Sequence, residues 1–181
     1  MDFEISKYEA NASRLIHTIK SFIGSGIENL IIALFDNDSA ACKEIDVLKN
    51  VNIPQNIKVM KYPNIEIANK YPCIGPSGLE LMNINGLACG IELYLGQEFL
   101  KGDDGEFHQI QWTGYIKSIN QYQGSLINKV QIQNKFRDKM KKSKYGELKK
   151  EDFKELIAIL DLMNNAWKTH HNRVDGSTSG R

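Results

Sequence analysis

Residues 29–41 read NLIIALFDNDSAA, and this stretch decides the expected fold. The apolar run over residues 29–35 is short and rich in β-forming residues, which is typical of a strand buried on both faces of a parallel sheet. The run stops at Asp36-Asn37-Asp38, three polar residues in a row. The sequence therefore predicts a buried strand whose carboxyl end carries two aspartates.

The neighbouring segments predict a helix on each side of this strand. Apolar residues recur at helical spacing over residues 11–23, before a Gly-Ser-Gly stop. A short helix over residues 39–48 should follow the aspartates, with Ser39 or Asp38 as its N-cap. Residues 57–60 predict a second strand, and the order strand, helix, strand favours an α/β fold.

The remainder of the chain alternates between loop and helix signals. Residues 62–86 contain three of the four prolines and predict a loop with short extended pieces. We expect a helix over residues 87–95 and an edge strand or hairpin over residues 107–115. Two further helices are predicted over residues 127–140 and 151–169, the second from an apolar stripe that includes Leu160.

Composition excludes several classes of protein. The 181 residues fit one domain, and their 41% hydrophobic and 25% charged content is ordinary for a globular protein. The first residues, MDFEISKYEA, do not resemble a signal peptide, and no apolar run is long enough to cross a membrane. Three cysteines without a CxxC pair give no zinc signature and suit a reducing compartment. We therefore expect a cytoplasmic protein without a membrane partner.

The formal net charge of +1 conceals an uneven distribution. Residues 135–150 carry eight basic and two acidic side chains, whereas residues 1–134 carry 11 basic and 15 acidic ones. Such a basic block either binds a phosphate backbone or is a solvated helix face. The candidate nucleic-acid-binding residues are Lys135, Arg137, Lys139, Lys141, Lys142 and Lys144.

The two aspartates are the strongest candidates for chemistry. In extended backbone, Asp36 and Asp38 point to the same face, where two like charges need a cation or a shared proton. Carboxylate oxygens favour Mg²⁺ or Mn²⁺, and ligands of open α/β sheets bind at the carboxyl ends of strands. Glu92 is a third candidate ligand. The alternatives are a helix-capping or loop role for the aspartates and an exposed helical position for Glu92.

Four stretches resemble the Toprim domain, and more narrowly the HEPN/Toprim-associated proteins of bacteria and OLD-type nucleases. They are SRLIHTIKSFIGSGIENLIIALFDNDSAA (13–41), YPCIGPSG (71–78), NINGLACGIELYLG (83–96) and QWTGYIKSINQYQG (111–124). The resemblance implies a mostly parallel sheet with flanking helices over residues 1–126. Helices with the basic patch would occupy residues 127–170, and residues 171–181 would form a disordered tail.

The resemblance also implies roles for individual residues. The two aspartates of the DxD motif bind Mg²⁺ in Toprim domains, and Glu92 falls on the glutamate of a Ser-x-Glu element. This chain departs from the pattern at Gly90, which replaces the serine, and at Asn83, where an acidic residue is expected. The first Toprim strand, with its catalytic glutamate, is missing from the pattern. A longer natural chain, a partner or Glu4 would have to supply that glutamate.

Three functions follow from these observations as hypotheses. The first is a Mg²⁺- or Mn²⁺-dependent nuclease in bacterial defence, with Asp36, Asp38 and Glu92 as catalytic and metal-binding residues acting on DNA or RNA. The second is a non-catalytic Toprim remnant that binds nucleic acid, a HEPN domain or another protein chain, including a second copy of itself. The third is a phosphatase of the haloacid-dehalogenase type with Asp36 as nucleophile. Trp112, Tyr115 and Tyr122 either stack on bases or anchor a core.

Overall fold

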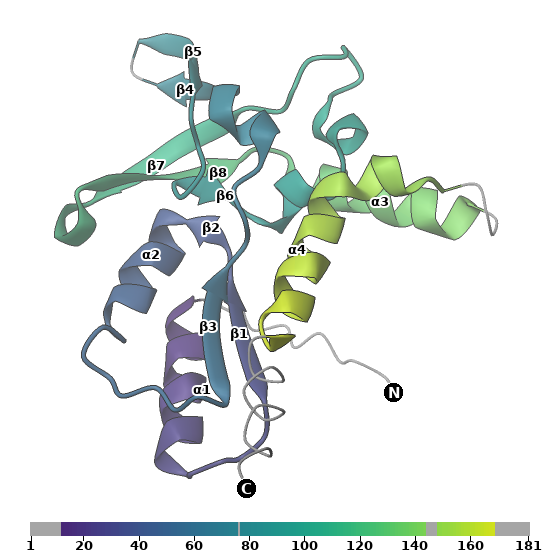
Figure 1. Cartoon of the computed structure of the whole chain (residues 1–181). Coiled ribbons are helices and arrows are strands. Elements are labelled where there is room, and N and C mark those ends of the chain that lie inside the picture. The colour runs from purple at the N-terminus through teal and green to yellow at the C-terminus, as the bar shows by residue number, and fades with distance from the viewer. Residues whose placement is uncertain (1–11, 76, 144–147, 169–181) are drawn as a thin grey trace, which may run out of the picture.

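The computed structural model describes residues 12–75, 77–143 and 148–168, which form a mixed α/β fold (Figure 1). The α-helices are α1 (Ala12–Gly24), α2 (Ser39–Asp46), α3 (Lys129–Lys142) and α4 (Lys154–Asn165). The strands are β1 (Ile31–Phe35), β2 (Asn37–Asp38), β3 (Ile57–Lys61), β4 (Tyr71–Gly75), β5 (Gly78–Met82), β6 (Ala88–Cys89), β7 (Ile110–Ile116) and β8 (Gln121–Leu126). The 3₁₀-helices are η1 (Glu66–Lys70), η2 (Ile91–Tyr94), η3 (Gln97–Leu100), η4 (Lys117–Ile119) and η5 (Lys150–Phe153).

Strand β1 lies between two layers of side chains, as the apolar run predicts. It pairs in parallel with β3, from Ile31 opposite Ile57 to Phe35 opposite Lys61. Ala33 and Phe35 pack against α1 and α2 in a smaller hydrophobic core. The intervening Leu34 points the other way and packs against the main hydrophobic core, which is described below. Figure 1 shows α1 and α2 on one side of this strand pair and α4 on the other.

The remaining strands form small sheets of mixed direction. Four strands are ordered β5-β4-β7-β8, with β4 and β7 parallel and the two outer pairs antiparallel. Strands β2 and β6 form a separate antiparallel pair. The expectation of one mostly parallel sheet was therefore wrong for the described residues. Short connections such as the one between β7 and β8 permit only antiparallel pairing. Of the two alternatives for residues 107–115, the edge strand is wrong because β7 lies between β4 and β8, whereas a hairpin is present, formed by β7 and β8.

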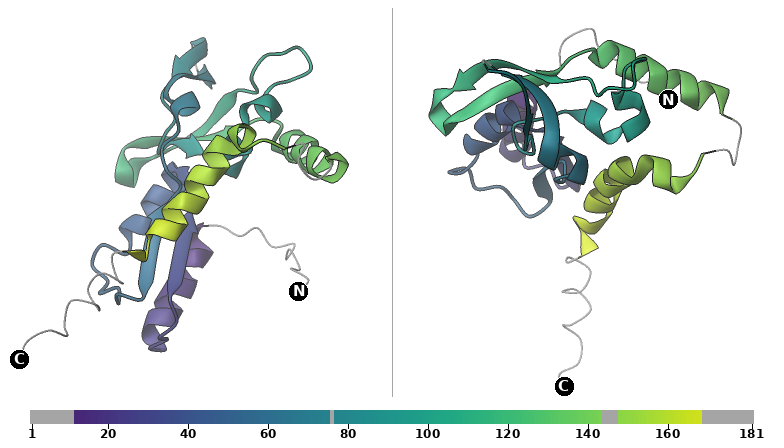
Figure 2. Two further views of the ribbon diagram at one scale, coloured as in Figure 1. Left: turned by 45° about the vertical axis from the view of Figure 1, so that its right-hand side comes forward. Right: turned by 90° about the horizontal axis from the view of Figure 1, so that it is seen from above.

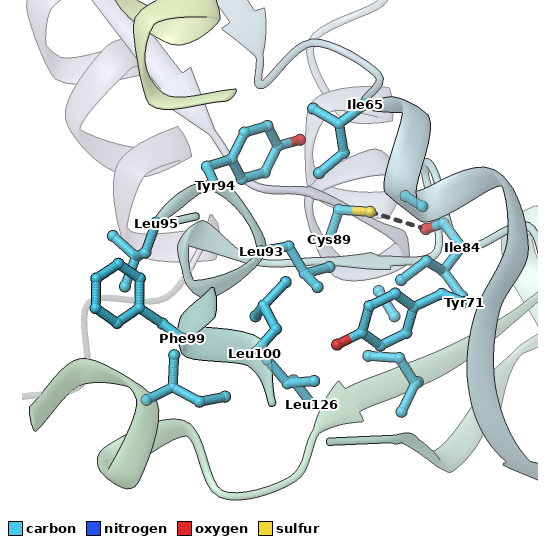
Figure 3. Close-up of a cluster of buried hydrophobic side chains, with 14 of the residues drawn as sticks. Ile65, Tyr71, Ile84, Cys89, Leu93, Tyr94, Leu95, Phe99, Leu100 and Leu126 are labelled. Atoms are coloured by element: carbon cyan, nitrogen blue, oxygen red, sulfur yellow. Dashed lines mark hydrogen bonds between the residues drawn. The ribbon is translucent and has the colours of Figure 1, made fainter. Parts of the chain in front are cut away.

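The main hydrophobic core joins the four-stranded sheet to the C-terminal helices. Figure 3 shows Tyr71, Leu93, Tyr94 and Leu100 within it. Helix α3 contributes Ile132, and α4 contributes Ile159, both almost fully buried. Leu160, which belongs to the expected apolar stripe of α4, is 53% exposed because the buried face of the helix is centred on its neighbour. The views in Figure 2 place α3 and the turn of the β7–β8 hairpin at opposite ends of the molecule.

Several expectations fall on residues that the structure does not describe. Glu4, Lys144 and the tail over residues 171–181 lie outside the described ranges. Within those ranges, none of the helices combines the length and the apolar character needed to cross a bilayer.

Candidate metal site

The two aspartates lie where β1 gives way to α2. Asp36 directly follows β1, Asn37 is buried, and Asp38 is the N-cap of α2. One carboxylate oxygen of Asp38 accepts a hydrogen bond from the backbone N–H of Ala41 at 2.7 Å. Asp38 therefore orients the first turn of α2, as expected for an N-cap, and leaves its second oxygen for another partner.

The pairing of β2 with β6 brings Glu92 to the aspartates. Asn37 is opposite Cys89, so the residues just beyond this pair, Asp36 and Gly90, are neighbours across the two strands. The helix expected over residues 87–95 is wrong: β6 is extended, and Glu92 lies in the 3₁₀-helix η2. Gly90 has extended backbone angles (φ −79°, ψ 174°), which delays the start of the helical turn.

Glu92 is buried in a position that depends on a glycine and on α3. Its side chain is 6% exposed, and one carboxylate oxygen accepts a hydrogen bond from Gln133 Nε2 at 2.7 Å. The other oxygen lies 3.8 Å from Lys129 Nζ. A Cβ atom at Gly90 would lie only 2.9 Å from that second oxygen, so a serine at this position would displace the carboxylate. The glycine that departs from the Toprim pattern thus makes room for Glu92.

The three carboxylates influence one another electrostatically. Burial raises the pKa of Asp36 to about 6, and the negative charges of Asp38 and Glu92 add to the rise, whereas Lys129 opposes it. Burial, together with the charges of Asp36 and Glu92, likewise raises the pKa of Tyr62 to about 12. The ionised carboxylate of Asp36 therefore carries an energetic cost that a nearby cation would relieve.

A cavity of about 630 Å³ opens beside the aspartates. Asp36, Asp38 and Tyr62 line it, together with Arg14 and Thr18 from the first turns of α1. Both polar and apolar groups therefore face a space large enough for part of a small polar molecule or a chain segment. The residues that line the cavity do not include Glu92, which lies on η2.

The carboxylate oxygens of Asp36, Asp38 and Glu92 are ligands of the type that a hard divalent cation prefers. The three side chains are not, however, gathered around one point. No group of three or more His, Cys, Asp or Glu in the described ranges has the arrangement that would hold a metal ion. The Glu92 carboxylate contacts Gln133 and Lys129. One carboxylate oxygen of Asp38 is engaged by the N–H of Ala41 at the start of α2. A cation that binds Asp36, Asp38 and Glu92 through oxygen would have to draw Glu92 away from the lysine.

Comparisons with models of protein families, with curated proteins and with solved structures found no match. The site is therefore described by its own geometry. Asn83, which stands where the Toprim pattern has an acidic residue, is exposed and accepts a hydrogen bond from the backbone N–H of Asn85 at 3.1 Å. It supports the turn that precedes β6.

The basic block is partly neutralised by acidic side chains distant in the sequence. Lys135 lies 2.9 Å from Asp103, and Lys139 forms an ion pair with Glu98. Arg137 donates a hydrogen bond to Asn134 at 2.8 Å. Lys141 and Lys142 are exposed in the last turn of α3, where cations also complement the helix dipole. The block is thus less positive than its sequence suggests.

Three residues of the site were not among the sequence candidates. Lys129 and Gln133 are four residues apart on α3, so both side chains lie on one face of the helix and reach Glu92. The spacing is visible in the sequence, but only the packing of α3 against η2 shows what the two residues contact. Tyr62, which follows β3, was also missed, because a tyrosine after a strand is not a distinctive signal.

Proposed function

We propose that this chain provides a Toprim-type site for a divalent cation, Mg²⁺ or Mn²⁺, that acts in phosphodiester cleavage of nucleic acid. The observation that carries the proposal is the approach of Glu92, on η2, to the segment at the carboxyl end of β1 that carries Asp36 and Asp38. The adjacent cavity, which two of these carboxylates line, supports it. We further propose a role in bacterial defence, because the resemblance is to the HEPN/Toprim-associated proteins of bacteria.

The residues of the chain would divide the work as follows. Asp36, Asp38 and Glu92 would hold the cation, and the hydrogen bond from the Ala41 N–H would fix the orientation of the Asp38 carboxylate. A bound Mg²⁺ supplies Lewis acidity toward a phosphoryl oxygen. Lys129, freed from Glu92, would then be available to a phosphate group. Lys141 and Lys142 would attract the nucleic-acid backbone.

A non-catalytic role of the same site remains the second candidate. A cation bound here would also relieve the repulsion among the carboxylates. It would thereby stabilise the packing of η2 and α3 against the end of β1. The phosphatase alternative is less favoured. It requires the second aspartate as an acid or base, whereas one Asp38 oxygen is engaged as the cap of α2.

The nuclease proposal predicts Mg²⁺-dependent cleavage that weakens in acid. Labelled single- and double-stranded DNA and RNA would be incubated with the full chain over a series of Mg²⁺ concentrations and pH values. Because the pKa of Asp36 is about 6 in the metal-free protein, protons compete with the cation below that pH. The Mg²⁺ needed for half-maximal cleavage should therefore increase about tenfold for each pH unit below about 6.

Two outcomes would decide against this proposal. Cleavage that persists unchanged in excess EDTA would show that no divalent cation is involved. Binding of Mg²⁺ without cleavage of any of the four substrates would favour the non-catalytic role. The matched control is Glu80→Gln on β5, an exposed carboxylate outside the site that should leave the Mg²⁺ dependence unaltered.

A further inference from the structure

Three aromatic side chains form a continuous ladder along the β7–β8 hairpin, and we refer to Trp112, Tyr115 and Tyr122 as the aromatic ladder. The ring centroids of Trp112 and Tyr122 are 6.1 Å apart, and those of Tyr115 and Tyr122 are 5.1 Å apart. Tyr115 is 47% exposed and Tyr122 is 57% exposed. Large aromatic rings left open to solvent in this way are typical of binding surfaces.

The backbone of the hairpin places the three rings on one face. Trp112 is paired with Gly124, the register then shifts before Gly114, and Tyr115 is paired with Tyr122. The extra residue at this shift turns Tyr115 to the same face as Trp112. A Cβ atom at Gly124 would lie 2.8 Å from the Trp112 ring, so the indole packs directly over the glycine.

The surroundings of the ladder favour a polyanion. Residues 107–137 contain no Asp or Glu, and the hairpin itself carries Lys117. Gln111, Thr113 and Gln123, which strand alternation places on the opposite face of the hairpin, are exposed and also uncharged. A phosphate backbone could therefore lie along this face without repulsion from a side chain of the hairpin.

The ladder also adjoins the candidate metal site. The hydroxyl of Ser39, the residue after Asp38, donates a hydrogen bond to the backbone carbonyl of Tyr122 at 2.5 Å. Ser39 is fully buried, and its hydroxyl also lies 3.2 Å from the backbone carbonyl oxygen of Leu87. Figure 1 shows the hairpin lying next to α2, whose first turn carries the Asp38 cap. A strand held on the ladder would thus lie close to the carboxylates.

We propose that the aromatic ladder stacks against unpaired bases and thereby binds single-stranded nucleic acid beside the carboxylates. This inference rests on the proposed function, since it names the form of nucleic acid that the site receives. Stacking of a base on an exposed aromatic ring contributes about 1–3 kcal/mol and tolerates any base sequence. Duplex bases are already stacked within the helix, so the ladder discriminates in favour of single strands.

The test measures binding in metal-free buffer containing EDTA, so that cleavage does not interfere. Fluorescence anisotropy would follow labelled oligodeoxythymidine and oligouridine of about 12 nucleotides, and a DNA duplex of equal length. We expect the full chain to bind the single strands more tightly than the duplex. Replacing both exposed rings, Tyr115→Ala with Tyr122→Ala, should weaken single-strand binding about 10- to 100-fold.

Matched variants separate stacking from other effects. Tyr115→Phe with Tyr122→Phe keeps both rings and should bind as the unaltered chain does. Leu79→Ser with Leu81→Ser changes exposed residues of β5 on the same sheet and should have no effect. Asp36→Asn should weaken Mg²⁺ binding about 100-fold or more and, because it removes negative charge near the strand, should not weaken strand binding, so failure of the metal site and failure of the ladder are distinguishable.

Several results would overturn the inference. These are an absence of single-strand binding, equal affinity for the duplex, or unaltered affinity in the double alanine variant. A change in sedimentation coefficient of that variant, with unaltered affinity for the oligonucleotides, would assign the ladder to a protein interface and equally contradict the proposal. Circular dichroism checks that the alanine variant is folded, which we expect because both tyrosines are exposed.

Discussion

Asp36→Asn should remove the heat of Mg²⁺ binding and, in the same protein, increase the stability of the metal-free fold at neutral pH. The loss of one of three carboxylate ligands should weaken Mg²⁺ binding about 100-fold or more. The gain in stability arises because the ionised carboxylate of Asp36 destabilises the metal-free fold. Burial disfavours its charge, and the negative charges of Asp38 and Glu92 do so as well. Calorimetric titration and chemical unfolding measure the two effects separately.

The sign of the stability effect follows from the pKa. The pKa of Asp36 is about 6 in the folded chain against 3.8 ordinarily, so the folded state holds its proton more tightly. The natural chain should therefore gain stability as the pH falls from about 6 to about 4, and the Asn variant should lack this gain. At pH 7 we expect the variant to be more stable by about 1–2 kcal/mol, after allowance for partial solvent screening.

Lys129→Met is the variant with the opposite expected effect on binding. The positive charge of Lys129 lies next to Glu92 and partly neutralises the negative charge of the three carboxylates. Its removal leaves more negative charge to attract Mg²⁺. Mg²⁺ affinity should then increase about tenfold. A loss of affinity in this variant, or an Asp36→Asn protein that binds Mg²⁺ normally, would contradict the assignment of the site.

Tyr94→Ala should destabilise the whole fold by about 3–5 kcal/mol. The Tyr94 side chain is fully buried, its ring centroid lies 5.1 Å from that of Tyr62, and its hydroxyl donates a hydrogen bond to the carbonyl of Pro63 at 2.7 Å. Figure 3 shows the ring among Ile65, Leu95 and Cys89. The substitution removes both the buried ring and the link between η2 and the segment after β3. Urea unfolding gives the free-energy difference.

Tyr94→Phe separates the ring from the hydroxyl. It should cost only about 1 kcal/mol, because packing is retained and one hydrogen bond is lost. Since Glu92 is two residues away on η2, the Phe variant should keep Mg²⁺ affinity within about threefold. Equal destabilisation by Phe and Ala would mean that the hydroxyl, rather than the ring, holds η2 in place.

The sequence was most informative where local periodicity and burial agree. The apolar run before Asp36 predicted β1, and the Asp38 cap with the helix after it is confirmed. Strand β8 was not predicted, because its glutamines and Gly124 give no apolar alternation. The expected helix around Glu92 was wrong because β6 pairs with β2, where Asn37 lies opposite Cys89, 52 residues along the chain, and this pairing keeps residues 88–89 extended.

Contacts between distant residues explain what else the sequence could not predict. The basic block appeared fully available, but Lys135 pairs with Asp103 across 32 residues and Lys139 with Glu98 across 41. The resemblance placed Glu92 with the aspartates, whereas Lys129 and Gln133 became visible only through the packing of α3. Single-residue patterns carry no information about such pairings.

The central claim is that Asp36, Asp38 and Glu92 bind one divalent cation. The most direct measurement is nuclear magnetic resonance of the isotopically labelled chain during addition of substoichiometric Mn²⁺, whose unpaired electrons broaden nearby signals. We expect the signals of these three residues and of Gly90 to broaden first and excess Mg²⁺ to restore them. Broadening centred on the exposed carboxylates of Asp103, Asp104 and Glu106, or spread evenly over surface carboxylates, would contradict it.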